Sequence, residues 1–114
     1  MIIYLASPYS HPDKWVREQN FRKVTKIAAQ MNAQGEIVIS PITYGHTLVM
    51  FHEMPTDWEF WQNFCFTLLV KCDKILVYKM PGWESSRGVA EEISIARDHG
   101  IQIEYLEYEE SLIT

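Results

Sequence analysis

Residues 74–92 read KILVYKMPGWESSRGVAEE, and they contain the junction that decides the fold. The first five residues form a mostly apolar, partly β-branched run that is typical of a buried strand. Glycines, hydroxyls, an arginine and carboxylates follow at the expected start of a helix. In open α/β sheets, ligands bind outside the carboxyl ends of the strands and at helix N-termini. This order of strand, polar turn and helix therefore predicts an α/β sheet with a binding site at the turn.

Strands and helices alternate along the rest of the chain. Short apolar runs indicate strands at 2–6, 36–40, 74–78 and 101–105. Helical spacing of apolar residues indicates helices from Asp13 to about Gly35, from Thr56 or Asp57 through Leu69, and from about Ser86 to His99. Residues 41–55 lack convincing periodicity, so we expect a functional or lid-like loop there. We expect one α/β domain over residues 1–114, with a small, mostly parallel sheet of four to five strands.

The charge balance and the cysteines restrict the class of partner and the compartment. The net charge of −5 and pI near 5.3 argue against a nucleic acid polymer as partner, because phosphate neutralisation needs clustered Lys and Arg. Four basic residues do gather in one predicted helix, at a spacing that suits its solvated face: Arg17, Arg22, Lys23 and Lys26. Cys65 and Cys72 lie seven residues apart on a predicted helix, too far for a disulfide. With no apolar run of membrane-spanning length and no basic segment typical of a secretory signal, we expect a cytoplasmic protein without membrane contact.

Glu91 and Glu92 are adjacent acids near the start of the predicted fourth helix. A helix turns about 100° per residue, so only one of them can face a groove above the sheet. Glu92 lies beside the apolar stripe of Val89, Ile93 and Ala96, so it flanks the buried face. The helix dipole is expected to favour its ionised form, as a nucleophile requires. The alternative is an acid that only complements the dipole.

The same helix start offers the groups that a phosphate or carboxylate needs. Ser86 supplies a hydroxyl and Arg87 a guanidinium, between the flanking glycines Gly82 and Gly88 and after Trp83. Ordinary capping of the helix N-terminus explains the serine at this position nearly as well. Capping alone would not require the arginine or the glycines, so both explanations stay open.

Further candidates come from other segments. Tyr4 lies in the first strand, and Ser7, Pro8 and Tyr9 follow its carboxyl end, where they would line the same crevice. Tyr4 would otherwise be a core tyrosine with a bonded hydroxyl. Asp57 offers an acid, and the nearby Trp58 and Trp61 offer flat surfaces suited to a planar base, although aromatic residues at this spacing usually form a core. His46 is a candidate for contact with the base; the four histidines are scattered, so we expect no metal site and no cofactor.

Three segments of the chain resemble the nucleoside 2-deoxyribosyltransferase superfamily: IYLASPY at 3–9, CDKILV at 72–77 and PGWESSRGVAEE at 81–92, followed by Ala96 and Gly100. The resemblance is closest to small, uncharacterised phage and bacterial members, which are related to deoxynucleoside 5′-monophosphate N-glycosidases. It extends from Ile2 to about Tyr105 and is weakest between Pro41 and Pro55.

The resemblance implies a flavodoxin-like or Rossmann-like three-layer fold and cleavage of the N-glycosidic bond of a (deoxy)nucleoside 5′-monophosphate, by hydrolysis or base exchange. Glu92 falls at the position of the family's nucleophile, Ser86 at that of its phosphate-binding serine, and Tyr4 at that of an active-site tyrosine. The resemblance also implies a homo-oligomer, for which the aromatic helix around Trp58 to Phe66 offers a surface.

One position departs from the family pattern. Eight residues before Asp73, where the family places an aspartate, this chain has Cys65. Asp57, Glu59 or Asp73 would then supply the acid. Alternatively, the chain is a non-catalytic nucleotide-binding module that has lost the acid.

Overall fold

The strands form one parallel sheet, as the alternation of strands and helices predicts. In a computed structural model that describes residues 1–109, the elements in chain order are β1 (Ile2–Ala6), α1 (Lys14–Ala33), β2 (Ile37–Ile39), α2 (Pro41–Phe51), α3 (Trp58–Leu69), β3 (Lys74–Tyr78), the short 3-10 helix η1 (Trp83–Ser85), α4 (Arg87–Asp98) and β4 (Gln102–Leu106). The strand order is β2-β1-β3-β4, with Tyr4 of β1 in register with Ile75 of β3 and Ile39 of β2. This order is that of the first four strands of a flavodoxin-like sheet.

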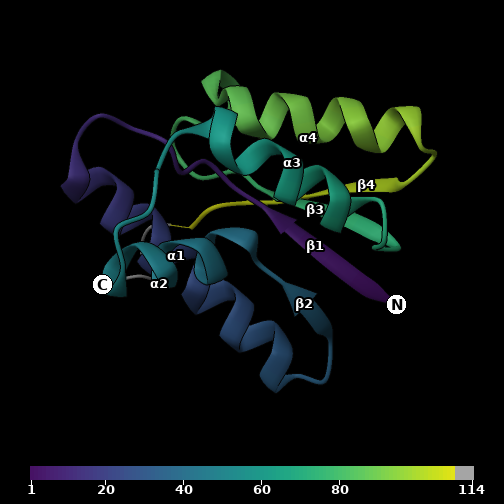
Figure 1. Cartoon of the computed structure of the whole chain (residues 1–114). Helices are drawn as coiled ribbons and strands as arrows, with labels where there is room; N and C mark the ends of the chain where they lie inside the picture. Colours follow the sequence, from purple (N-terminus) through teal and green to yellow (C-terminus); the bar gives the residue numbers. More distant parts are fainter. Residues whose placement is uncertain (110–114) are drawn as a thin grey trace.

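Helices cover both faces of the sheet and give three layers (Figure 1). α3 and α4 lie on one face, and α1 and α2 on the other. Side chains of a strand alternate between the faces. Tyr4 and Ala6 therefore pack under α3 and α4, whereas Ile3 and Leu5 belong to the core on the α1 side. The fold is a flavodoxin-like or Rossmann-like α/β sandwich, as predicted.

Side-chain caps fix where the helices begin. Asp13, Asp57 and Ser86 accept hydrogen bonds from the N–H groups of Trp15, Phe60 and Val89, so α1, α3 and α4 start where the sequence predicts. Each such cap is worth about 1 kcal/mol. The starts of α3 and α4 both lie at the carboxyl-end edge of the parallel sheet (Figure 1).

The predicted loop at 41–55 is wrong, because Pro41–Phe51 is helix α2. Ser40 accepts a hydrogen bond from the Thr43 N–H, and Pro41 occupies the first helical position. Proline suits that position because its ring fixes a helical φ and its missing N–H would have no partner there. Pro41 therefore marks a helix start and not a turn. Gly45 and His46 of this helix are buried.

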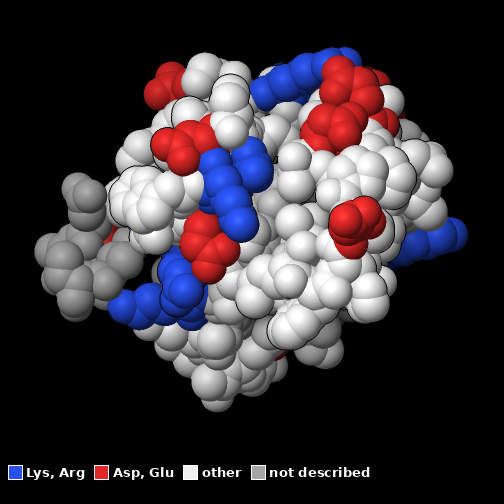
Figure 2. All heavy atoms as spheres, turned by 60° about the vertical axis from the view of Figure 1, so that its left-hand side comes forward, with Lys and Arg blue, Asp and Glu red and all other residues white. Residues whose placement is uncertain are grey.

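The basic residues of α1 make contacts within the chain. Arg22 pairs with Glu18, the Lys23 ammonium lies over the Tyr108 ring, and Arg17 donates to backbone carbonyls that precede α1. On the face shown in Figure 2, Lys and Arg are interleaved with Asp and Glu, and much of the middle is uncharged. This face therefore has no continuous basic patch. Within residues 1–109, no helix combines the length and the apolarity needed to cross a bilayer.

Candidate functional site

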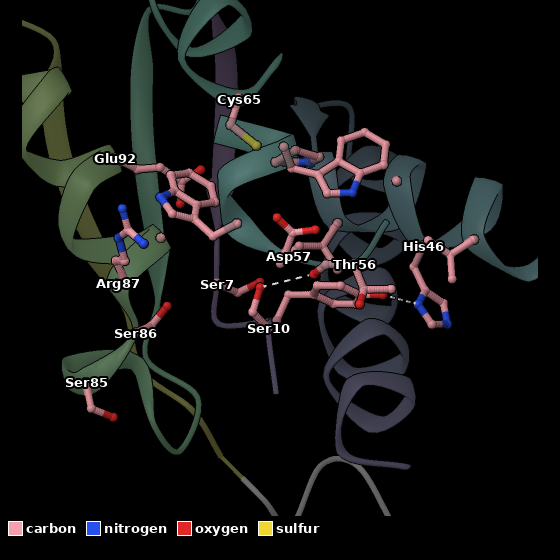
Figure 3. Close-up of a pocket in the computed structure, with 18 residues that line it drawn as sticks. Ser7, Ser10, His46, Thr56, Asp57, Cys65, Ser85, Ser86, Arg87 and Glu92 are labelled. Atoms are coloured by element: carbon pink, nitrogen blue, oxygen red, sulfur yellow. Dashed lines mark hydrogen bonds between the residues drawn. The ribbon is translucent and has the colours of Figure 1, made fainter. Parts of the chain in front are cut away.

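A cavity of about 310 Å³ opens at the carboxyl ends of β1 and β3, where the strand order reverses direction. Its walls come from the loop after β1, from α2, from α3 with the residues before it, and from the start of α4. Figure 3 shows these segments around one space. The volume falls within the range of small-molecule sites, and such switch points are where open α/β sheets bind ligands.

The carboxyl group of Glu92 lies at the inner wall of this cavity. Only 4% of Glu92 is exposed, and the hydroxyl of the fully buried Tyr4 donates a hydrogen bond to Glu92 Oε2. Tyr4 reaches it from the middle of β1, because Tyr4 points to the face that α4 covers. The sequence spacing placed Glu92 beside the apolar stripe, and the structure buries it there. Tyr4 combines the two roles considered for it: a core residue whose hydroxyl holds a cavity carboxylate.

The ionisation state of Glu92 differs from the expectation. Burial raises its pKa to about 8, and the Tyr4 hydrogen bond lowers it by less. The helix dipole does not keep Glu92 ionised, because its effect fades within the first turn and Glu92 is the sixth residue of α4. Desolvation penalises the charged form of a buried carboxylate. Glu92 is therefore mostly neutral at pH 7.

Cys65 lies next to the hydrogen-bonded pair of Tyr4 and Glu92. It is buried on the inner side of α3, lines the cavity, and belongs to the cluster that contains Tyr4. Burial, and then the nearby Glu92, raise the pKa of its thiol to about 12. A thiol with such a pKa is a poor proton donor at neutral pH. The position where the resemblance expects an acid thus holds a neutral, weakly polar group.

The start of α4 borders the cavity through Ser85, Ser86, Arg87 and Gly88. The Ser86 hydroxyl caps the helix by accepting from the Val89 N–H, so the capping explanation holds. The N–H groups of Arg87 and Gly88 lie in the first turn, where the helix offers no acceptor for them. The Ser86 hydroxyl also keeps its own proton to donate. This turn can therefore still bind an anion.

The charge of Arg87 is already engaged. Its guanidinium forms ion pairs with Glu59 of α3 and with Glu91 one turn along α4. These pairs link the starts of α3 and α4 at the rim of the cavity. A bound anion would have to compete with two carboxylates for this side chain.

Ser7 carries a buried polar atom without a partner. Its side chain lines the cavity just beyond β1, only 5% of the residue is exposed, and among the described residues none accepts from or donates to its Oγ. An unpaired buried hydroxyl is costly, at about 1–3 kcal/mol. A polar atom of a ligand in the cavity would satisfy it.

Two tryptophans of α3 form flat walls. The Trp58 ring lies over Gly88 and donates its indole N–H to Glu91; the Trp61 ring lies against Gly45 and donates its N–H to the Pro55 carbonyl at 2.8 Å. Both rings are thus fixed by their polar edges. Both rings also line the cavity, where they can pack against a planar group.

On the side of α2, three polar side chains form a continuous hydrogen-bonded chain. Tyr9 Oη lies 2.7 Å from His46 Nδ1, and His46 Nε2 lies 2.8 Å from Glu18 Oε2 of α1. The His46 ring packs on Phe21 with centroids 4.4 Å apart and is 5% exposed. Tyr9 and His46 line the cavity, whereas Glu18 stands behind them.

Residues 1–109 match the model of a family described as Domain of unknown function (DUF1937). The chain belongs to the DUF1937 family. Comparison with curated proteins gives no match. The family description assigns no activity to a DUF1937 domain, so the function of this one has to be inferred from its site.

Most of the site residues predicted from the sequence meet in the cavity of this DUF1937 domain. The residues that line it are Ser7, Tyr9, His46, Asp57, Ser86, Arg87, Gly88 and Glu92, with Tyr4 directly behind Glu92. Asp57 is an exposed helix cap, and its Oδ2 accepts from the Phe60 N–H at 3.1 Å. Of the three carboxylates considered as substitutes for the missing acid, only Asp57 lines the cavity.

Three predicted residues lie outside the cavity lining. Pro8 is buried within the loop after β1. Gly82 adopts a positive φ of 92° at the start of η1, where it makes the turn after β3. The Trp83 ring packs against Tyr105 of β4, with the Lys79 ammonium over it, and so belongs to another surface.

Two features of the site of this DUF1937 domain are not predicted from the sequence: the α2 wall, and Glu18 behind His46. Ile42, Gly45 and Val49 line the cavity but fall in the segment taken as a loop. The Ser40-Pro41 pair is a helix-start signal that would have placed them on a helix. Glu18 has no such signal, because its contact with His46 joins residues 28 positions apart.

Proposed function

We propose that this domain cleaves the N-glycosidic bond of a (deoxy)nucleoside 5′-monophosphate, with Glu92 as the nucleophile. The observation that carries the proposal is the buried Glu92 carboxyl group, held by Tyr4 at the wall of a largely apolar cavity. Glycosidic cleavage passes through an oxocarbenium-like centre, which a carboxylate beneath the sugar stabilises. The resemblance to the nucleoside 2-deoxyribosyltransferase superfamily also supports the proposal, because it implies a nucleophile at this residue.

The reaction has two displacements at the anomeric carbon. An ionised Glu92 oxygen forms a bond to that carbon while the bond to the base breaks, and the electron pair leaves with the base nitrogen. Water then attacks the same carbon in a hydrolase, or a second base attacks it through a ring nitrogen in a transferase. The attacking group gives up a proton to solvent as its bond forms, and the bond to Glu92 breaks to release the carboxylate. The anion-binding groups favour a monophosphate and, with it, the hydrolase.

The other walls fit the remaining parts of such a substrate. The Trp58 and Trp61 faces suit a planar base. The first-turn amides of α4 and the Ser86 hydroxyl suit the 5′-phosphate, and the unpaired Ser7 hydroxyl can donate to a sugar or phosphate oxygen. In this assignment Arg87 shapes the rim through its two ion pairs and adds less to phosphate binding than its charge suggests.

Chromatographic detection of free base tests the proposal. Wild type and Glu92→Gln are incubated with ribo- and deoxyribonucleoside 5′-monophosphates, each with and without a second base. Release that requires Glu92 but no second base indicates a hydrolase, and exchange only with the second base indicates a transferase. Glu36→Gln is the matched control, because Glu36 is an exposed carboxylate at the opposite edge of the sheet, just before β2. Equal release by Glu92→Gln would refute the proposal.

A non-catalytic nucleotide-binding module is the second candidate. It is favoured by the thiol of Cys65 at the expected acid position and by the raised pKa of Glu92, which leaves little nucleophile at neutral pH. Calorimetry on the same panel separates the two. Binding of a nucleotide without release of base at any pH would establish the module.

We also infer that the domain assembles with copies of itself in the cytoplasm. Aromatic side chains of α2 and α3 that point away from the core support the assembly: Tyr44, Phe60 and Phe64 are all exposed. The two buried free thiols, Cys65 and Cys72, are consistent with a reducing compartment.

A further inference from the structure

The hydrogen-bonded chain of Tyr9, His46 and Glu18 has a defined polarity. Glu18 has a lowered pKa, chiefly because of its hydrogen bond with His46. An ionised carboxylate only accepts hydrogen bonds, so His46 Nε2 carries a proton and donates it to Glu18. Nδ1 is then the ring nitrogen that can gain or lose a proton, and it faces the Tyr9 hydroxyl at 2.7 Å.

The protonation state of Nδ1 decides what Tyr9 offers to the cavity. When Nδ1 is unprotonated, the Tyr9 O–H donates to it, and the cavity meets only the lone pairs of the phenol oxygen. When Nδ1 carries a proton, it donates to the phenol oxygen, and the Tyr9 O–H can turn towards the cavity. Charged His46 thus makes Tyr9 a hydrogen-bond donor to a ligand.

We propose that Tyr9 protonates the leaving base and that His46, oriented by Glu18, replaces the proton. This inference rests on the proposed glycosidic cleavage and names its acid. In a displacement, the nucleophile and the leaving group occupy opposite sides of the reacting carbon. Glu92 and His46 lie on opposite sides of the cavity in Figure 3, and Tyr9 lines the same space.

Protons move in one direction, from His46 to Tyr9 and from Tyr9 to the leaving base. The bond between the anomeric carbon and the base nitrogen breaks, and the electron pair stays on the base. The base takes the Tyr9 phenol proton, the phenol oxygen takes the Nδ1 proton of charged His46, and His46 becomes neutral while Nε2 keeps its bond to Glu18. Solvent reprotonates Nδ1 after the base has left. Tyr9 is the catalytic residue here, and His46 and Glu18 act through it.

The other polar groups near the cavity fit this role less well. Asp57 already caps α3, because its Oδ2 accepts the Phe60 N–H at 3.1 Å. Burial raises the pKa of the Cys65 thiol to about 12.

Several charged groups surround the hydrogen-bonded side chains of Tyr9, His46 and Glu18. Glu18 faces His46 from α1 through Oε2, while Arg22 pairs with Oε1 of the same carboxylate. Arg17 acts on Tyr9 and lowers the pKa of the phenol, but burial outweighs it and the pKa is raised. On the cavity side, Asp57 and Glu92 are the titratable carboxyl groups.

Leaving-group dependence tests the proposal. The natural deoxynucleoside 5′-monophosphate that is cleaved fastest is compared with an analogue whose base needs no proton: N7-methylguanine for a purine, or 5-fluorouracil for a pyrimidine. Tyr9→Phe and His46→Gln are expected to lower kcat on the natural substrate by about 10²- to 10⁴-fold, the usual contribution of a general acid. On the activated analogue the loss should stay below about tenfold. Tyr105→Phe, an exposed tyrosine of β4, is the control and should change neither rate.

The outcomes separate this proposal from the proposed glycosidic cleavage on which it rests. If Glu92→Gln abolishes both reactions but Tyr9→Phe slows them equally, Glu92 remains the nucleophile and the relay is refuted. If Asp57→Asn instead shows the selective loss, Asp57 is the acid and the relay is again refuted. If wild type cleaves neither substrate, both proposals fail. Nitrogen-15 spectra of the His46 ring give a check independent of turnover, because neutral His46 must carry its proton on Nε2; a proton on Nδ1 would contradict the chain.

Discussion

At the scale of single residues, Glu92 needs ionisation to attack, yet burial favours its neutral form. Because the pKa of Glu92 is about 8, we expect kcat/KM to rise about tenfold per pH unit up to that value and to level off above it. The activated analogue is the right substrate, because its base leaves without a proton and Glu92 alone sets the profile. Steady-state rates between pH 5 and pH 10 provide the measurement. A profile that is already flat at pH 6 would show that Glu92 is ionised in the free enzyme.

Tyr4→Phe tests whether Glu92 sets the pH profile of kcat/KM. The Tyr4 hydrogen bond lowers the pKa of Glu92, so its removal should move the midpoint of the profile to higher pH. A downward shift would mean that Tyr4 stabilises the neutral carboxyl group instead.

The same carboxyl group couples folding to pH. Its folded pKa of about 8 lies above the ordinary value of 4.5, so the neutral form stabilises the fold fully below about pH 4.5. This contribution is lost as the pH rises from 4.5 to 8, at about 1.4 kcal/mol per pH unit. Glu92→Gln keeps a neutral side chain, so its stability relative to wild type should increase over that range. Urea unfolding of both proteins at pH 5, 6.5 and 8 measures the difference, and a constant difference would exclude a raised pKa.

At the scale of elements, two glycines decide how closely α3 packs on its neighbours. A Cβ on Gly45 of α2 would lie 3.5 Å from the Trp61 ring, which is ordinary contact. A Cβ on Gly88 of α4 would lie 3.1 Å from the Trp58 ring, which cannot recede freely because its N–H is bonded to Glu91 and the ring makes a T-shaped contact with Phe66. Of these two positions, only Gly88 therefore lacks room for a methyl group.

The pair Gly45→Ala and Gly88→Ala tests this packing. Alanine is favoured over glycine within a helix by about 1 kcal/mol, so Gly45→Ala should stabilise the domain by up to that amount. Gly88 is the second residue of α4, where this interior preference does not apply in full. Gly88→Ala also incurs overpacking of about 1–3 kcal/mol, so we expect a net loss of about 1 kcal/mol. Chemical denaturation compares the two variants. Equal stabilisation by both would show that Trp58 moves aside without cost.

Element boundaries also show what local sequence can and cannot specify. Strands β1 and β3 match their predicted ranges, because buried apolar runs bounded by turn residues carry the signal themselves. Parallel topology alone predicts that Ser7, Ser86 and Glu92 meet at one edge of the sheet, and all three line the cavity there. Helix α2 was missed because a proline was taken as a turn residue, and the contact of Glu18 with His46 is tertiary and leaves no pattern in the sequence.

At the scale of the whole molecule, aromatic side chains of α2 and α3 form an exposed surface. Tyr44 and Phe64 stack with their planes 5° apart, and Phe60 and Phe64 of α3 both contact Trp61, whose ring forms a wall of the cavity. Apolar surfaces of this kind commonly mark interaction sites. A second copy covering this surface would also brace the Trp61 wall from outside.

We therefore expect a dimer or larger assembly at micromolar concentration. Phe64→Glu should produce a monomer, because an uncompensated charge in an apolar interface is strongly unfavourable. Tyr105→Glu is the matched control, since Tyr105 is exposed to a similar extent on the edge strand β4. Light scattering and circular dichroism are measured together, so that loss of assembly is separated from loss of fold. A wild-type monomer would remove the assembly and leave the cavity to function within one chain. A Phe64→Glu variant that stays assembled would place the interface on another face.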